Sequence, residues 1–254
     1  MSAPIDGFTQ FDFADGGIEH AVYRKGVGSG VLIMHELPGL TPQCIDLANR
    51  IASAGYTVFL PLLFGEPNSS ATVANTLRVC VSREFKCFAL NESSPISVWL
   101  RALGQRIYGD LNGNGIGVIG LCLTGGFVLS LMADSEVLAP VTSEPSLPFL
   151  DLTDAGQRAL GVSDADLDAA VENGRELLGF RFSGDWICPV KRFDTLQARF
   201  GKRFIRTDID SSPGNPAGIP SHAHSVLTED YNNTPGHPTR VAFDKVIAFL
   251  RRNL

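Results

Sequence analysis

The segment Gly115-Ile-Gly-Val-Ile-Gly-Leu-Cys-Leu-Thr-Gly-Gly126 carries the most specific signal in this sequence for both fold and chemistry. It predicts a buried strand that ends at Gly120, a sharp turn that carries Cys122, and the start of a helix. This is the geometry of a nucleophile elbow, which projects one side chain, and the helix N-terminus favours a thiolate there. The usual elbow has a glycine where Thr124 stands. A buried structural cysteine at such a junction is the alternative interpretation.

Elsewhere, short apolar runs alternate with segments of helical periodicity. The predicted strands are 30–35, 56–60, 115–120, 137–140, 178–182 and 203–208, and the predicted helices are 42–53, 95–107, 125–132, 163–174, 190–200 and 240–252. Strands that are largely apolar through their length and alternate with helices indicate a mostly parallel sheet with helices on both faces. In such a sheet the ligand site lies beyond the carboxyl ends of the strands. We expect one α/β domain over residues 1–254, with a lid-like insertion at about 142–173.

Composition limits the class of protein. The 254 residues include 21 basic and 27 acidic side chains, a net charge of −6, and 44% are hydrophobic. This excludes a disordered chain and argues against nucleic acid or a membrane as partner. No apolar run is long enough to span a bilayer, and the N-terminal residues do not have the pattern expected of a signal peptide. Five irregularly spaced cysteines predict free thiols, so we expect a cytoplasmic protein.

Two more candidate residues follow predicted strands. Asp185 comes after the strand 178–182, where a carboxylate is placed to orient a histidine; a turn or capping aspartate is the alternative. His224 lies in the loop after the last predicted strand, from which it can reach across the carboxyl edge of the sheet. The alternative interpretations are a solvent-exposed histidine or a pair of metal ligands formed with His222. We expect no metal, because no third ligand has suitable spacing. The chain order Cys122, Asp185, His224 is the nucleophile–acid–base order of the α/β-hydrolase fold.

The loop after the first predicted strand completes the candidate site. In this architecture it supplies one oxyanion-hole N–H and the residue after the nucleophile supplies the other, which selects Leu37 and Leu123. Glu36 is either a carboxylate that hydrogen bonds the thiol or a structural acid that ties down the loop. No glycine-rich phosphate loop follows a strand, so we expect no cofactor.

At these positions the sequence resembles the dienelactone hydrolase family, the cysteine-using branch of the α/β-hydrolases. The resemblance runs from about residue 28 to the C-terminus, and its matching pieces are 35–39, 61–65, 120–126, 184–185 with 189, and 223–225. It implies an α/β-hydrolase fold and a triad of Cys122, His224 and Asp185. It also implies that Glu36 holds the resting thiol and helps to deprotonate it when substrate enters.

The sequence departs from the family where the substrate would bind. Best-known members place an arginine four residues after the catalytic histidine, where it meets the substrate carboxylate and Glu36; Thr228 stands there in this chain. A second substrate-binding arginine corresponds to Arg83, for which a surface salt bridge is the alternative.

We therefore expect a hydrolase of small-molecule esters or lactones without assuming dienelactone itself as the substrate. Because a thiolate leaves readily, activated esters, enol lactones and thioesters fit better than amides. The alternatives are a thioesterase or acyltransferase on the same site, a redox-sensing thiol, or a non-catalytic relative.

Overall fold

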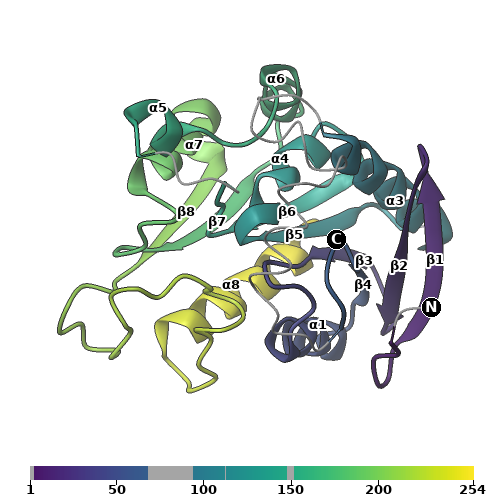
Figure 1. Cartoon of the computed structure of the whole chain (residues 1–254), viewed down its shortest axis with the longest axis horizontal. Coiled ribbons are helices and arrows are strands. Elements are labelled where there is room, and N and C mark those ends of the chain that lie inside the picture. Colours follow the sequence, from purple (N-terminus) through teal and green to yellow (C-terminus); the bar gives the residue numbers. More distant parts are fainter. Residues whose placement is uncertain (1–2, 68–93, 112, 148–151) are drawn as a thin grey trace.

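An eight-stranded sheet forms the centre of the computed structural model, which describes residues 3–67, 94–111, 113–147 and 152–254 (Figure 1). The strand order is β1-β2-β4-β3-β5-β6-β7-β8, and β3 to β8 are all parallel to one another. The strands are β1 (Thr9–Asp15), β2 (Ile18–Lys25), β3 (Gly30–Met34), β4 (Thr57–Pro61), β5 (Ile116–Leu121), β6 (Val137–Ser143), β7 (Leu177–Phe182) and β8 (Phe204–Ile209). Every residue of β3, β4, β5 and β7 is buried, as expected for strands covered on both faces.

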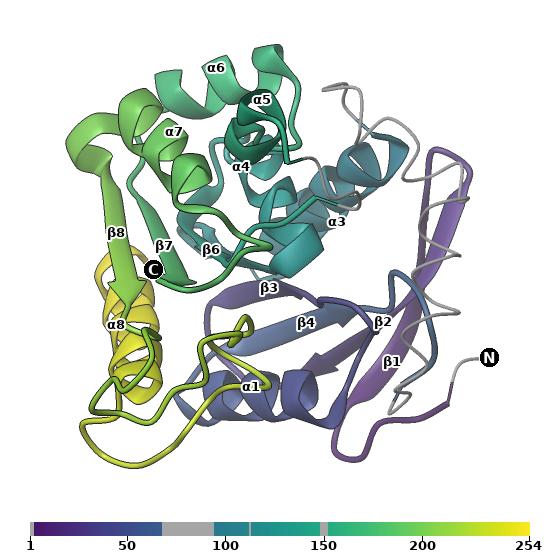
Figure 2. The same ribbon diagram turned by 60° about the vertical axis from the view of Figure 1, so that its left-hand side comes forward.

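Helices cover both faces of this sheet, as the sequence predicts (Figure 2). On one face lie α1 (Pro42–Ser53) and α8 (Pro238–Asn253), and on the other lie α3 (Pro95–Leu111), α4 (Phe127–Leu131), α5 (Asp154–Arg158), α6 (Asp164–Glu172) and α7 (Val190–Phe200). Each face has its own apolar core; Leu47 and Val246 belong to one, Trp99 and Phe193 to the other. Among the described helices, none combines the length and apolar character needed to cross a membrane.

The first two strands were not predicted. They form an antiparallel hairpin, β1–β2, whose turn is Gly16 (φ +57°) and Gly17 (φ +81°). A two-residue turn in the left-handed region strongly favours glycine, and Gly-Gly between two extended runs is a hairpin signal. Along β1, half-buried Phe11 and Phe13 alternate with exposed residues. This is the alternation of an antiparallel strand with one solvated face.

Strand β6 is longer than its prediction, which ended at residue 140. Pro140 lies in the strand opposite Val118 of β5, and pairing with β7 starts one residue later, at Val141 and Leu178. The sheet therefore tolerates a residue without an N–H at that point. Because β6 continues to Ser143, the residues that follow it reach the carboxyl edge of the sheet.

The segment 142–173, which we expect to be lid-like, contains the end of β6 and the helices α5 and α6. Helix α6 packs against α4 on one face of the sheet. Residues 148–151 of this segment lie outside the described residues.

Candidate active site

Cys122 stands at the end of β5, where the chain turns sharply. Its φ is +49°, in the left-handed region, and a short 3-10 helix over Cys122–Gly125 leads on to α4. Gly120 permits this turn, because a Cβ atom there would lie 2.4 Å from the carbonyl oxygen of Thr124. The predicted strand, turn and helix are therefore present, and the thiol is half-buried.

Thr124 explains why the glycine of the usual elbow is displaced. Its hydroxyl accepts the N–H of Leu121 at 3.0 Å and lies 2.8 Å from the carbonyl oxygen of Met34, the last residue of β3. The close approach occurs one residue later, since a Cβ on Gly125 would lie 2.9 Å from Cα of Pro145. Thr124 thus ties the turn to the neighbouring strand.

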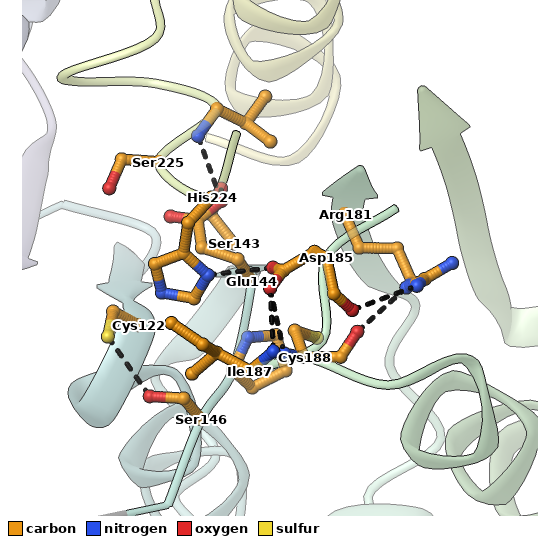
Figure 3. A network of polar contacts seen from close by, with 12 residues as sticks. Cys122, Ser143, Glu144, Ser146, Arg181, Asp185, Ile187, Cys188, His224 and Ser225 are labelled. Carbon is orange, nitrogen blue, oxygen red and sulfur yellow. Dashed lines mark hydrogen bonds and ion pairs between the residues drawn. The ribbon is translucent and has the colours of Figure 1, made fainter. Parts of the chain in front are cut away.

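Asp185 and His224 form a hydrogen-bonded pair beside Cys122 (Figure 3). Asp185 follows β7, and its Oδ2 lies 2.7 Å from Nδ1 of His224. Its Oδ1 accepts the N–H groups of Ile187 at 2.9 Å and Cys188 at 3.1 Å, and its side chain is only 1% exposed. Because an ionised carboxylate can only accept, Nδ1 of His224 carries the proton.

The other ring nitrogen of His224 is directed to the thiol. Figure 3 shows the imidazole between Asp185 and Cys122, with its Nε2 edge toward the Cys122 side chain. Nε2 is buried and faces the Cys122 sulfur, whose negative charge and hydrogen bond both raise the pKa of the imidazole. It is therefore placed to exchange a proton with the sulfur or with a group bound there.

The charge of His224 depends on these neighbours. Burial lowers its pKa, but the negative charge of a Cys122 thiolate and the hydrogen bond to Asp185 outweigh burial and raise the pKa to about 12. An imidazolium beside the sulfur favours the thiolate in return. The arrangement therefore places a positively charged imidazole beside the nucleophilic sulfur.

Ser146, which the sequence analysis missed, lies within hydrogen-bond distance of the thiol. Its Oγ lies 3.0 Å from Sγ of Cys122, and its N–H donates to the Cys122 carbonyl oxygen at 3.0 Å (Figure 3). Ser146 follows the true end of β6, so the rule of inspecting residues after strands would have found it. The prediction stopped that strand at Pro140, three residues too early.

Glu36 lies after β3, and its carboxylate accepts hydrogen bonds from the loop that contains His224. One oxygen accepts the hydroxyl of Ser225 at 2.6 Å, and the other accepts the hydroxyl of Thr228. Burial raises the pKa of Glu36, while the two hydroxyls stabilise its charged form. These contacts fit the interpretation of Glu36 as an acid that ties down loops. Within the described residues, no hydrogen bond joins it to Cys122.

A second buried carboxyl, Glu144, contacts the same loop and was also missed. Its Oε2 accepts the N–H of Val226 at 3.1 Å and the hydroxyl of Ser143 at 2.5 Å. Burial and the nearby charge of Glu36 raise the pKa of Glu144 well above its usual range. The residues after His224 are thus held from two sides, by Glu36 and by Glu144.

The remaining predicted residues fall in different places. Leu37 and Leu123 pack against the same apolar core, and they follow β3 and β5, which are neighbours in the sheet. Arg83 lies outside the described residues. His222 is exposed, and within the described part of the chain no group of three or more His, Cys, Asp or Glu is arranged to hold a metal.

Comparisons with known proteins agree with this architecture. Residues 20–175 match the family described as the dienelactone hydrolase family. A comparison with curated proteins found no match.

Solved structures show the fold. A Klebsiella pneumoniae protein assigned as a dienelactone hydrolase aligns with a TM-score of 0.67 and 15% identity, over 96% of this chain and 98% of that one. A dienelactone hydrolase from Anabaena variabilis aligns with a TM-score of 0.61 and 15% identity, over 98% and 99% of the two chains. A dienelactone hydrolase-like promiscuous phosphotriesterase from metagenomic libraries gives a TM-score of 0.59 and 16% identity, over 95% and 97%. These likenesses confirm the predicted α/β-hydrolase fold.

Proposed function

Since the chain belongs to the dienelactone hydrolase family, we propose that it hydrolyses an ester or lactone of a small molecule through a thioester on Cys122. The observation that carries this proposal is the 2.7 Å hydrogen bond between Asp185 and His224, beside a half-buried thiol on a sharp turn. A buried carboxylate, an oriented imidazole and an activated nucleophile are the parts that acyl transfer needs.

Acylation begins from the thiolate–imidazolium pair. The sulfur of Cys122 attacks the carbonyl carbon, a C–S bond forms, and the π electrons move to the carbonyl oxygen. The backbone N–H groups of Leu37 and Leu123 stabilise this oxyanion. When the intermediate collapses, the C–O bond breaks and His224 gives its Nε2 proton to the leaving oxygen. Asp185 keeps the proton of Nδ1 in place throughout.

Deacylation restores the resting state. The neutral His224 takes a proton from a water molecule, whose oxygen attacks the thioester carbonyl. Collapse of the second tetrahedral intermediate breaks the C–S bond, and the electron pair returns to the sulfur of Cys122. The histidine is then an imidazolium again, beside a thiolate, and the acid product leaves.

The properties of sulfur narrow the substrate. Each tetrahedral intermediate of acylation partitions between loss of the substrate oxygen and loss of the thiolate, and a thiolate leaves readily. We therefore propose activated esters and enol lactones as substrates and exclude amides. Thr228, which donates a hydrogen bond to Glu36, stands where related enzymes have an arginine. This position therefore provides no positive charge to bind a carboxylate group of the substrate.

A thioesterase or acyltransferase on the same site remains the alternative within this chemistry.

The free thiols of Cys44 and Cys188 support our further proposal that the protein works in the cytoplasm.

A substrate panel tests the proposed function. We would compare an aryl ester, an enol lactone, an acyl thioester and an anilide, with the wild-type protein and with Cys122→Ala, in water and with an added alcohol as acyl acceptor. We expect ester and lactone hydrolysis that falls to background in the variant, and no cleavage of the anilide. Hydrolysis that persists in Cys122→Ala would overturn the proposal. Transfer to the alcohol in preference to water would favour the acyltransferase.

A further inference from the structure

A serine hydroxyl touches the nucleophile on the side away from the histidine (Figure 3). The side chain of Ser146 is buried, with only 4% of the residue exposed, and its Oγ lies 3.0 Å from Sγ of Cys122. The same residue donates its backbone N–H to the Cys122 carbonyl oxygen at 3.0 Å. Ser146 therefore contacts both the side chain and the main chain of the nucleophile.

We propose that Ser146 is a further catalytic residue, whose hydroxyl donates a hydrogen bond to the Cys122 thiolate at rest and again when the thiolate leaves in deacylation. The second half of this statement rests on the proposed function, whereas the first concerns the resting protein alone. The contact distance by itself allows either group to donate. Its direction follows from the charge of the sulfur, because a thiolate has no proton and can only accept.

The position of Ser146 is built by the fold. After β6, Glu144 takes a left-handed conformation with φ +38°, which turns the chain back over the nucleophile. Pro145 then packs against Gly125, since a Cβ on that glycine would lie 2.9 Å from Cα of Pro145. Any larger residue at position 125 would push the segment that carries Ser146 away from the sulfur.

A buried arginine fixes the same segment. Arg192 of α7 is 4% exposed, and its Nη1 donates to the carbonyl oxygen of Pro145 at 2.9 Å and to that of Ile187 at 3.1 Å. Ile187 is the residue whose N–H binds Asp185. One guanidinium thus holds the loop of Ser146 and the loop of Asp185 in a fixed relation. Its other nitrogens donate to the carbonyl oxygens of Gly156 and Ala159.

A donor at this place acts on two steps. At rest it stabilises the thiolate relative to the thiol, so a larger fraction of Cys122 is ready to attack. When the sulfur attacks, its electron pair enters the C–S bond and the hydrogen bond weakens. In deacylation the pair returns to the sulfur as the C–S bond breaks, and the hydroxyl of Ser146 is in place to receive that charge.

The test measures the thiolate without any substrate. We would follow alkylation of the peptide that contains Cys122 by iodoacetamide, as a function of pH, using mass spectrometry. In Ser146→Ala we expect the midpoint pH to rise by about one to two units, the amount that loss of one charge-assisted hydrogen bond implies. Ser146→Thr keeps the hydroxyl, so its midpoint should stay within about half a unit of wild type.

A matched control separates this effect from loss of any buried serine. Ser130 of α4 is also buried, and its hydroxyl donates to Asp166 at 2.6 Å. Ser130→Ala should leave the midpoint of Cys122 alkylation unchanged. If Ser146→Ala fails to fold, as thermal melting would show, Ser146→Gly removes the same hydroxyl and should shift the midpoint in the same direction.

A midpoint that stays constant or falls in folded Ser146→Ala or Ser146→Gly would overturn the inference, because the hydroxyl would then be a spectator or an acceptor of the thiol proton. The outcome is independent of the substrate panel. Ester hydrolysis with no shift would overturn this inference alone. A shift with no ester or lactone hydrolysis would overturn the proposed function, and with it the role of Ser146 in deacylation, but would leave its hydrogen bond to the resting thiolate.

Discussion

Replacing Asp185 by asparagine removes one proton acceptor and leaves the shape of the site intact. The amide oxygen of Asn would still accept the N–H groups of Ile187 and Cys188, as Oδ1 of the aspartate does. The amide NH₂ would then face Nδ1 of His224, which would have to accept a hydrogen bond instead of donating one. The imidazole is driven to the tautomer with its proton on Nε2, and the imidazolium loses its buried anion.

The size of this effect follows from the geometry. The lost contact is a 2.7 Å charge-assisted hydrogen bond to a carboxylate that is 1% exposed. Such bonds contribute about 1.5–3 kcal/mol, which corresponds to roughly ten- to 150-fold in rate. In serine triads, where the histidine must also remove the proton of the nucleophile, the same exchange costs about 10⁴-fold. With a thiolate already formed, that larger cost does not apply, and we expect Asp185→Asn to slow acylation by about ten- to 150-fold.

The assay is the pre-steady-state release of phenol from an activated aryl ester, with melting temperatures measured in parallel. The matched control is Asp134→Asn, which weakens a partly buried ion pair with Arg101 away from the triad and should acylate at the wild-type rate. An Asp185→Asn protein that is folded and acylates within about threefold of wild type would show that Asp185 does not support His224 in acylation.

Three further outcomes follow from the same contacts. Gly120→Ala should destabilise the protein by about 1–3 kcal/mol, read from denaturant unfolding, because its methyl group meets the carbonyl oxygen of Thr124; a neutral effect would contradict the tight turn. In Cys122→Ala the thiolate charge that raises the pKa of His224 is gone, while burial still lowers this pKa and the hydrogen bond to Asp185 still raises it, so the imidazole midpoint followed by NMR should fall below the wild-type value of about 12; a midpoint that stays at the wild-type value would argue against the ion pair. Glu36→Gln keeps an acceptor for the neighbouring hydroxyls and should lower acylation less than about tenfold, whereas a loss of about 10² or more would give Glu36 the thiol-activating role.

The parallel sheet and the elbow could be predicted because their signals are local. Runs such as 115–120 are apolar at every position, and that alone indicates strands covered on both faces. The rule that sites lie beyond the carboxyl ends of strands then selected Cys122 and Asp185, and the loop after the last strand supplied His224. The N-terminal hairpin also had a local signal, Gly16-Gly17, which went unused.

The contacts that complete the site could not be predicted, because they join segments far apart in the chain. Glu36 reaches Ser225 only because the loops that follow β3 and β8 meet at the carboxyl edge of the sheet. Ser146 reaches Cys122 because Glu144 adopts a positive φ, which is uncommon for a residue with a side chain. Because Pro140 lies inside β6, the strand was predicted to end there and not at Ser143. The residues that follow its true end, Glu144 and Ser146, were therefore not identified.

In the proposed mechanism Cys122 becomes acylated during every turnover. We would mix the protein with an aryl ester, quench it during the burst, and locate the added acyl mass by peptide mass spectrometry. We predict a burst of about one phenol per protein chain, with the acyl group on the peptide of Cys122, and neither in Cys122→Ala. Ester hydrolysis with an acyl group on another residue, or with the same burst in Cys122→Ala, would contradict it.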